Sequence, residues 1–144
     1  MAAARALTIG TLAEQTGCTV PTIRYYEDIG LLPPPRRGAG GQRSYAESDF
    51  ARLTFIRRCR DFDFSIEQVR ELVALVEDPE RDCVAAKDLA ETHLSAVRAK
   101  LRELRALEKS LSQFATACAA QCAGGPIRDC VILDAFSKPA GCGC

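Results

Sequence analysis

The chain has 144 residues, enough for one domain of ordinary size or for a small domain joined to an extended helix. Its 19 basic and 19 acidic residues cancel, so net charge identifies no class of partner, and no segment reads as a signal peptide or a membrane span. Eight cysteines without an export signal predict a cytoplasmic protein whose thiols serve metal or redox chemistry rather than structural disulfides.

Charge is nevertheless unevenly distributed along the chain. Residues 20–60 hold eight arginines against four acids, whereas acids accumulate in residues 61–91. A local excess of arginine suggests a surface that faces phosphates, although a solvated arginine face would give the same pattern. Charge alone therefore leaves the question of nucleic-acid binding open.

Two short helices are predicted near the N-terminus. Thr8 or Thr11 can cap the first, which Gly17 ends, and Thr19 can cap the second. Two short helices joined by a tight turn form the helix-turn-helix pattern. The prolines and glycines of residues 33–45 exclude a helix and predict a loop or a two-stranded wing.

Helical periodicity resumes after the wing. Residues 47–62 carry apolar side chains at helical spacing, and Ser65 with Gln68 fits a capping box that begins another short helix. Pro79 marks a break, because a proline interrupts helical hydrogen bonding. The sequence therefore predicts two further helices before residue 79.

Residues 82–117 contain neither glycine nor proline and predict one long helix of about 50 Å. Apolar side chains recur along it at steps of three and four, with charged residues between them. A helix with one apolar stripe and no remaining chain to cover it implies a two-stranded coiled coil, and hence a homodimer. The stripe consists of Leu94, Val97, Leu101, Leu104, Leu107, Leu111 and Phe114.

Several strings of residues are specific enough to suggest a family. Residues 22–32 read TIRYYEDIGLL, residues 43–45 read RSY and residues 53–60 read LTFIRRCR. These strings strongly resemble the DNA-binding domain of the MerR family of transcriptional regulators. Residues 130–136, CVILDAF, resemble the metal-binding loop and the following short helix of the metal-sensing branch of that family.

The resemblance covers essentially the whole chain and implies a mainly α fold. It implies a winged helix-turn-helix DNA-binding domain in residues 1–78 and a dimerisation helix in residues 79–117 that forms an antiparallel coiled coil. A metal-binding loop, a short helix and a cysteine-containing tail are expected in residues 118–144. In this family the dimer binds promoter DNA and, on binding metal, bends and untwists it so that RNA polymerase can engage both promoter elements.

Six arginine and tyrosine side chains are candidates for contact with double-stranded promoter DNA. One pair lies on the predicted second helix, one pair alternates along the wing, and one pair is three residues apart on the next helix. The neighbouring Tyr25 is interpreted as a core aromatic residue. The candidates are Arg24, Tyr26, Arg43, Tyr45, Arg57 and Arg60.

Four cysteines are candidates for metal ligands: Cys83, Cys118, Cys122 and Cys130. Thirty-five positions separate Cys83 from Cys118, so within one straight helix the two thiols cannot share an ion. In an antiparallel coiled coil, Cys83 of one chain would lie beside Cys118 and Cys130 of its partner. Four thiolates suit zinc or cadmium, and three suit mercury or lead. Cys122 fits either as a fourth ligand or as a spectator.

The resemblance implies a divalent ion (zinc, cadmium, lead or mercury), because the divalent sensors of the family resemble this chain in having a cysteine at the position of Cys83. Cys18 and Cys59 are expected to be small buried residues. The expected function is therefore a homodimeric, metal-responsive transcriptional regulator. No paired acid and base or activated nucleophile is visible, so an enzyme is not expected.

Two alternatives remain open. A redox or iron–sulfur sensor on the same scaffold would use the spacing Cys118-x3-Cys122-x7-Cys130 without depending on Cys83. A thiol-based protein that sequesters metal would not need the arginines of residues 24–60, so specific DNA binding separates it from a regulator.

Overall fold

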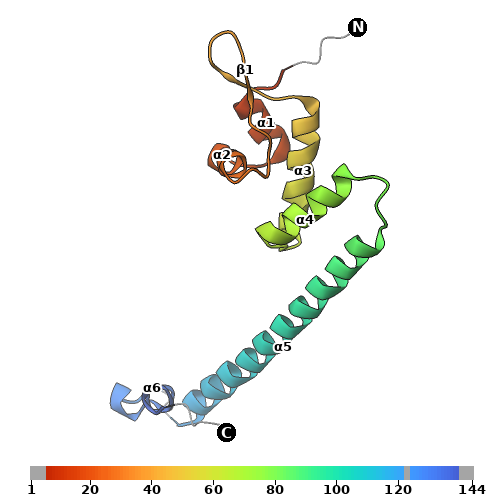
Figure 1. Ribbon diagram of the computed structural model, residues 1–144. Coiled ribbons are helices and arrows are strands. Elements are labelled where there is room, and N and C mark those ends of the chain that lie inside the picture. Colours follow the sequence, from red (N-terminus) through yellow and green to blue (C-terminus); the bar gives the residue numbers. More distant parts are fainter. Residues whose placement is uncertain (1–5, 122–123, 140–144) are drawn as a thin grey trace. The chain divides into compact units, whose positions relative to one another are not determined.

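The computed structural model describes residues 6–121 and 124–139, which are mainly helical with one short two-stranded sheet (Figure 1). The chain divides into two compact units, residues 1–90 and residues 91–144. The first unit holds the helix-turn-helix, the wing and two further helices. The predicted mainly α fold with a winged helix-turn-helix and a long helix is confirmed.

The helix-turn-helix is formed by α1 (Ile9–Thr16) and α2 (Val20–Asp28). The Thr8 hydroxyl accepts a hydrogen bond from the backbone N–H three residues later at 3.1 Å, and Thr19 does the same at 3.2 Å, so both helices have side-chain N-caps. Gly17 ends α1 in the left-handed conformation with φ 69°, which glycine adopts without steric cost. These local signals set the short turn between the two helices.

The wing consists of β1 (Arg36–Arg37) and β2 (Arg43–Ser44), which pair antiparallel with Arg37 opposite Arg43. The end of the wing is held to the N-terminal segment, because the backbones of Leu7 and Tyr45 exchange two hydrogen bonds of 2.9 Å. The predicted two-stranded wing is thus confirmed. Its base is fixed to the domain by backbone pairing.

The next two helices are α3 (Glu47–Asp61) and α4 (Ile66–Glu77). The predicted capping box is present at the start of α4: the Ser65 N–H donates to Gln68 Oε1 at 2.9 Å, and the Gln68 N–H donates to Ser65 Oγ at 3.2 Å. This pair satisfies two N–H groups that a helix start leaves unpaired. The box thereby fixes where α4 begins after the turn from α3.

A single hydrophobic core lies within the first unit. Its members come from α1 to α4, from the segments that follow α1 and α2, and from the end of the wing, so burial of apolar surface holds the helix-turn-helix against α3 and α4. The buried residues are Leu12, Cys18, Ile23, Tyr26, Leu31, Leu32, Tyr45, Leu53, Ile56, Cys59, Val69 and Val73.

The long helix α5 (Val84–Gln121) continues through the second unit, where a 3₁₀ turn (Ile127–Asp129) and α6 (Val131–Ser137) follow it. The predicted short helix after Cys130 is confirmed. However, α5 ends four residues later than expected, because alanine and glutamine favour helix and the next glycine, Gly124, follows only after the helix has ended.

Most of the predicted stripe on α5 is uncovered in the single chain. Its side chains from Leu94 to Leu111 remain 45–55% exposed. Phe114 differs, because its ring lies edge-to-face on Phe136 of α6 with centroids 5.4 Å apart, so α6 covers part of it within the same chain. No helix in the described part of the chain is both long enough and apolar enough to cross a membrane.

Candidate nucleic-acid interface and metal-binding cysteines

The two adjacent tyrosines of α2 are buried in the opposite order from the one expected. Tyr25 is 49% exposed, whereas Tyr26 is 6% exposed and belongs to the core. Burial raises the pKa of the Tyr26 hydroxyl, and the charge of Arg60 is the strongest influence that lowers it. Any contact that Tyr26 makes with DNA is therefore limited to the small exposed part of its side chain. Arg24 lies exposed on the same helix.

The wing residues Arg43 and Tyr45 both meet Glu27 of α2. The Tyr45 hydroxyl donates a hydrogen bond to Glu27 Oε1, and Arg43 Nε lies 3.4 Å from Glu27 Oε2. Tyr45 is only 1% exposed. The Tyr45 hydroxyl thus has a partner inside the domain, and the expected contact of Tyr45 with DNA stays a prediction. Glu27 was not among the predicted site residues, although an acid within an arginine-rich segment is a signal that points to it.

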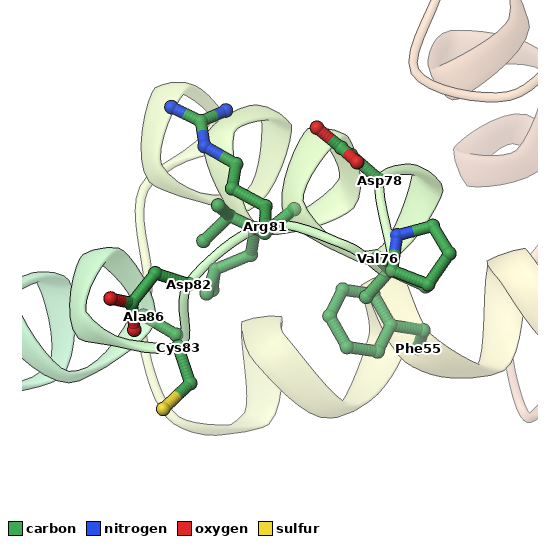
Figure 2. A pocket seen from close by; sticks show the side chains of 10 residues that line it. Phe55, Val76, Asp78, Arg81, Asp82, Cys83 and Ala86 are labelled. Carbon is green, nitrogen blue, oxygen red and sulfur yellow. The ribbon is translucent and has the colours of Figure 1, made fainter.

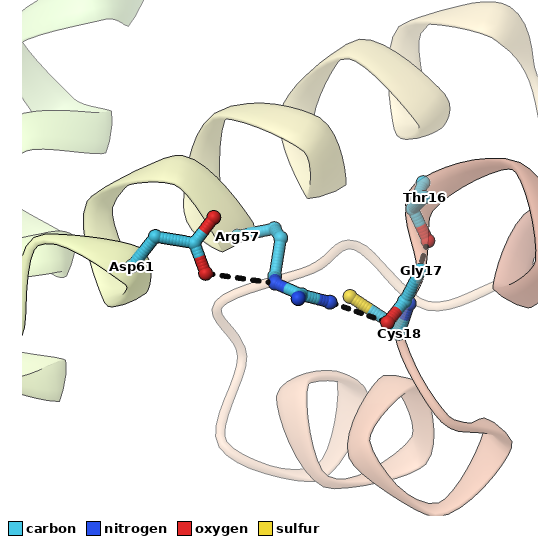
Figure 3. A network of polar contacts seen from close by, with 5 residues as sticks. All are labelled: Thr16, Gly17, Cys18, Arg57 and Asp61. Atoms are coloured by element: carbon cyan, nitrogen blue, oxygen red, sulfur yellow. Dashed lines mark hydrogen bonds and ion pairs between the residues drawn. The ribbon is translucent and has the colours of Figure 1, made fainter.

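Arg57 and Arg60 of α3 also have partners inside the domain. Arg57 Nε donates to Asp61 Oδ1 at 3.0 Å, and a terminal nitrogen of Arg57 donates to the carbonyl of Gly17 (Figure 3). The hydrogen bond to Asp61, followed by one to Cys18, raises the pKa of Arg57. Arg60 donates to the carbonyl of Phe64. These two candidates for DNA contact therefore already donate hydrogen bonds to groups inside the domain.

Two further arginines support α2, and neither was predicted to have a role. Arg52 Nε donates to the carbonyl of Leu31 at 2.9 Å, and Arg70 donates to the carbonyl of Ile29 at 2.8 Å. Ile29 is the C-cap of α2, where a helix leaves carbonyls unpaired, and Leu31 follows two residues later. The helix that carries Arg24 is thus anchored at its end by side chains from α3 and α4. Sequence spacing gives no signal for such long-range partners.

Cys83 lies exposed directly before α5, and its carbonyl accepts the N–H of Lys87 at 3.0 Å. It lines a mainly apolar cavity of about 310 Å³ together with Phe55, Val76 and Ala86 (Figure 2). Cys83 therefore lies beside a cavity that residues of α3, α4 and the first turn of α5 line. An ion bound there would be next to the helices that support the helix-turn-helix.

The other described cysteines differ in burial. Cys118 lies in the last turns of α5 and Cys130 precedes α6; both are half-buried, and neither forms a disulfide. Cys18 and Cys59 are buried as expected, and burial raises the pKa of the Cys59 thiol. Cys122, Cys142 and Cys144 lie outside the described residues.

A single chain does not assemble a complete metal site from its described residues. Across residues 6–121 and 124–139, no three histidine, cysteine or acidic side chains gather closely enough to hold an ion. Thiol groups are ligands that soft divalent ions prefer, so the donor chemistry of Cys83, Cys118 and Cys130 fits such an ion. The expected sharing of the site between two chains stays a prediction.

Comparison with known proteins gives consistent matches over nearly the whole chain. Residues 7–75 match the family model described as "MerR HTH family regulatory protein", and residues 50–114 match the model "MerR, DNA binding". The chain is 41% identical to the transcriptional regulator HmrR of Rhizobium leguminosarum bv. viciae, over 93% of this chain and all of that one. It is 38% identical to the regulator ZntR of Escherichia coli K12, over 92% and 93% of the two chains.

A solved structure also resembles this one closely. The crystal structure of the transcription regulator PbrR691 from Ralstonia metallidurans CH34, in complex with lead(II), superposes with a TM-score of 0.78 at 39% identity. The match covers 90% of this chain and 98% of that one. The similarity therefore includes the long helix and the segment after it as well as the helix-turn-helix.

Proposed function

The chain belongs to the MerR family of helix-turn-helix transcriptional regulators, and we propose that it is a homodimeric regulator that responds to a soft divalent metal ion. Metal binding changes the dimer so that promoter DNA is bent and untwisted and RNA polymerase can engage it. Deforming a short DNA site costs on the order of a few kcal/mol, a scale that coupling to metal binding can supply. Such a regulator acts on DNA in the cytoplasm.

The observation that carries this proposal is the position of two cysteines relative to the uncovered stripe of α5. Cys83 directly precedes α5, Cys118 lies in its last turns, and exposed leucines and valines lie between them. Pairing two such helices antiparallel would cover the stripe and bring Cys83 of each chain to Cys118 and Cys130 of the other. Dimer formation and the metal site would then share one interface.

The proposed DNA-binding surface is centred on Arg24 of α2 and Arg43 of the wing. Arg24 is exposed, and Arg43 keeps part of its side chain at the surface. We assign Arg60 and the exposed edge of Tyr26 to supporting phosphate contacts. Arg57 and Tyr45, whose polar groups are engaged within the domain, act by positioning the reading elements.

The solved structure of a relative supports a metal effector. PbrR691, which is 39% identical to this chain, was crystallised in complex with lead(II). For this chain we propose zinc, cadmium, lead or mercury, bound by Cys83 with Cys118 and Cys130 and with Cys122 as a fourth ligand for zinc or cadmium. Selectivity among these ions depends on bond angles and on groups around the thiolates.

Titration of the reduced dimer with each of the four ions, while transcription from its promoter is measured in vitro, tests this proposal. We expect at least one ion to raise transcription from DNA to which the apo-dimer is already bound. Transcription that depends on added iron and sulfide, and persists in Cys83→Ser, would instead favour the iron–sulfur alternative. A protein that binds metal but no specific DNA would favour sequestration.

A further inference from the structure

Glu27 places a carboxylate in an unexpected location. It lies on α2, within the arginine-rich segment whose surface we propose to face DNA, yet its side chain is only 8% exposed. A negative charge near bound phosphates lowers DNA affinity unless it has a compensating role. Burial of a charge is also costly unless partners stabilise it. The contacts of Glu27 indicate what that role is.

Both partners of Glu27 belong to the wing. Tyr45 donates its hydroxyl hydrogen bond to Oε1, and the guanidinium of Arg43 pairs with Oε2 at 3.4 Å. Burial raises the pKa of the Tyr45 hydroxyl, and the hydrogen bond and charge of Glu27 raise it further, so this group remains a donor at every physiological pH. Tyr45 is in turn fixed by its backbone pairing with Leu7. Glu27 therefore links α2 to the firmly held base of the wing.

Arg43 depends on this carboxylate for its placement. Its Nε is buried and has no hydrogen-bond partner among the described residues. The ion pair with Glu27 is therefore the interaction that offsets the cost of burying this nitrogen. The Arg43 side chain as a whole is 32% exposed, which leaves part of it at the surface. A guanidinium held at one edge by a carboxylate can present its other nitrogens to a phosphate.

We propose that Glu27 is a positioning residue for DNA binding: its carboxylate fixes the wing against α2, so that Arg43 and Arg24 meet the DNA backbone together. The charge of Arg24 also acts on the Tyr45 hydroxyl, which is consistent with Arg24, Glu27 and the wing forming one cluster. The inference rests on the proposed DNA-binding function. It means that Glu27, although negatively charged, raises the affinity of the protein for DNA.

The inference is tested by whether removal of one negative charge raises or lowers the affinity for DNA. Glu27→Gln and Asp28→Asn each remove one negative charge from neighbouring positions of α2, but Asp28 is exposed at the end of the helix. Affinity is measured by fluorescence anisotropy at fixed salt, with a labelled duplex that the wild-type dimer selects from a random-sequence pool. We expect Asp28→Asn to bind as tightly as wild type or more tightly, and Glu27→Gln to bind about tenfold more weakly, as for one lost contact.

Two further measurements separate positioning from a general loss of structure. In an Arg43→Ala background, Glu27→Gln should cause little additional loss, because the residue it positions is absent. A plot of log affinity against log salt concentration should also be less steep for Glu27→Gln, by an amount that corresponds to the loss of about one phosphate contact. Glu27→Asp, which keeps the charge on a shorter side chain, should recover part of the affinity if folding of Glu27→Gln is impaired.

Affinity of Glu27→Gln that equals or exceeds that of wild type would overturn the inference. So would losses that simply add in the Glu27 and Arg43 double variant. A wild-type dimer that selects no duplex would instead contradict the proposed function itself. The two failures are therefore distinguishable in the same experiment.

Discussion

Arg57 of α3 donates a hydrogen bond to the carbonyl of Gly17, the glycine that ends α1. The bond joins residues 40 positions apart and reaches the turn between the two helices of the helix-turn-helix. Asp61 holds the same guanidinium from the next turn of α3, so the arginine is oriented before it reaches the turn. Arg57 thereby links α3 to the turn that precedes α2.

The first prediction concerns stability. Arg57→Ala should lower the melting temperature of the dimer, because it removes the hydrogen-bond partner of the Gly17 carbonyl. Arg58→Ala removes the same charge from an exposed neighbour and should leave the melting temperature unchanged. Circular dichroism recorded during heating measures both melting temperatures. Equal melting temperatures for the two variants would show that the Arg57 contact does not hold the turn.

The elements that sequence predicted best are those fixed by neighbouring residues. The caps at Thr8 and Thr19 and the box of Ser65 with Gln68 connect groups only three positions apart, so spacing alone specifies them. The uncovered stripe of α5 was likewise predictable, because helical periodicity determines which side chains share a face. Local rules therefore gave the order of helices, the wing and the need for a partner.

Roles set by contacts between distant residues were not predictable in the same way. Tyr25 and Tyr26 are adjacent aromatics, and only the packing of α2 against the rest of the core decides which one is buried. The spacing of the wing residues likewise gave no sign that the Tyr45 hydroxyl donates to Glu27, 18 positions away. Among arginines, sequence cannot distinguish those that meet phosphate from those that meet a carbonyl.

The second prediction concerns DNA affinity. Arg24 lies exposed on α2, so Arg24→Ala should weaken binding to the selected duplex by about 1–3 kcal/mol without altering the fold. Arg98→Ala on α5 removes the same charge outside the winged helix-turn-helix and should have little effect. Fluorescence anisotropy at fixed salt, with circular dichroism as a check on folding, measures the difference. Unchanged affinity in Arg24→Ala would remove α2 as the reading helix.

The third prediction concerns the dimer. Leu104→Glu places a negative charge in the middle of the stripe. A partner helix would bury this charge without an opposite charge beside it, so the variant should be monomeric or aggregated. Ala106→Glu adds the same charge to the same helix away from the stripe and should remain dimeric. Sedimentation velocity at micromolar protein concentration separates these states. A well-folded wild-type monomer would contradict the interface.

The last prediction concerns the sharing of the metal site between chains. Replacing Cys83, Cys118 or Cys130 with serine should in each case abolish the transcriptional response, since the proposed ligands are thiolates. DNA binding should stay intact, because none of the three cysteines lies on the proposed DNA-binding surface. Serine at Cys122 should weaken or retune the response. A heterodimer of Cys83→Ser and Cys118→Ser chains is more informative, because a shared arrangement places both defects in one site and leaves the other site complete. Equilibrium metal titration should then find one tight site per heterodimer, whereas two equally weakened sites would mean that each chain binds its ion alone.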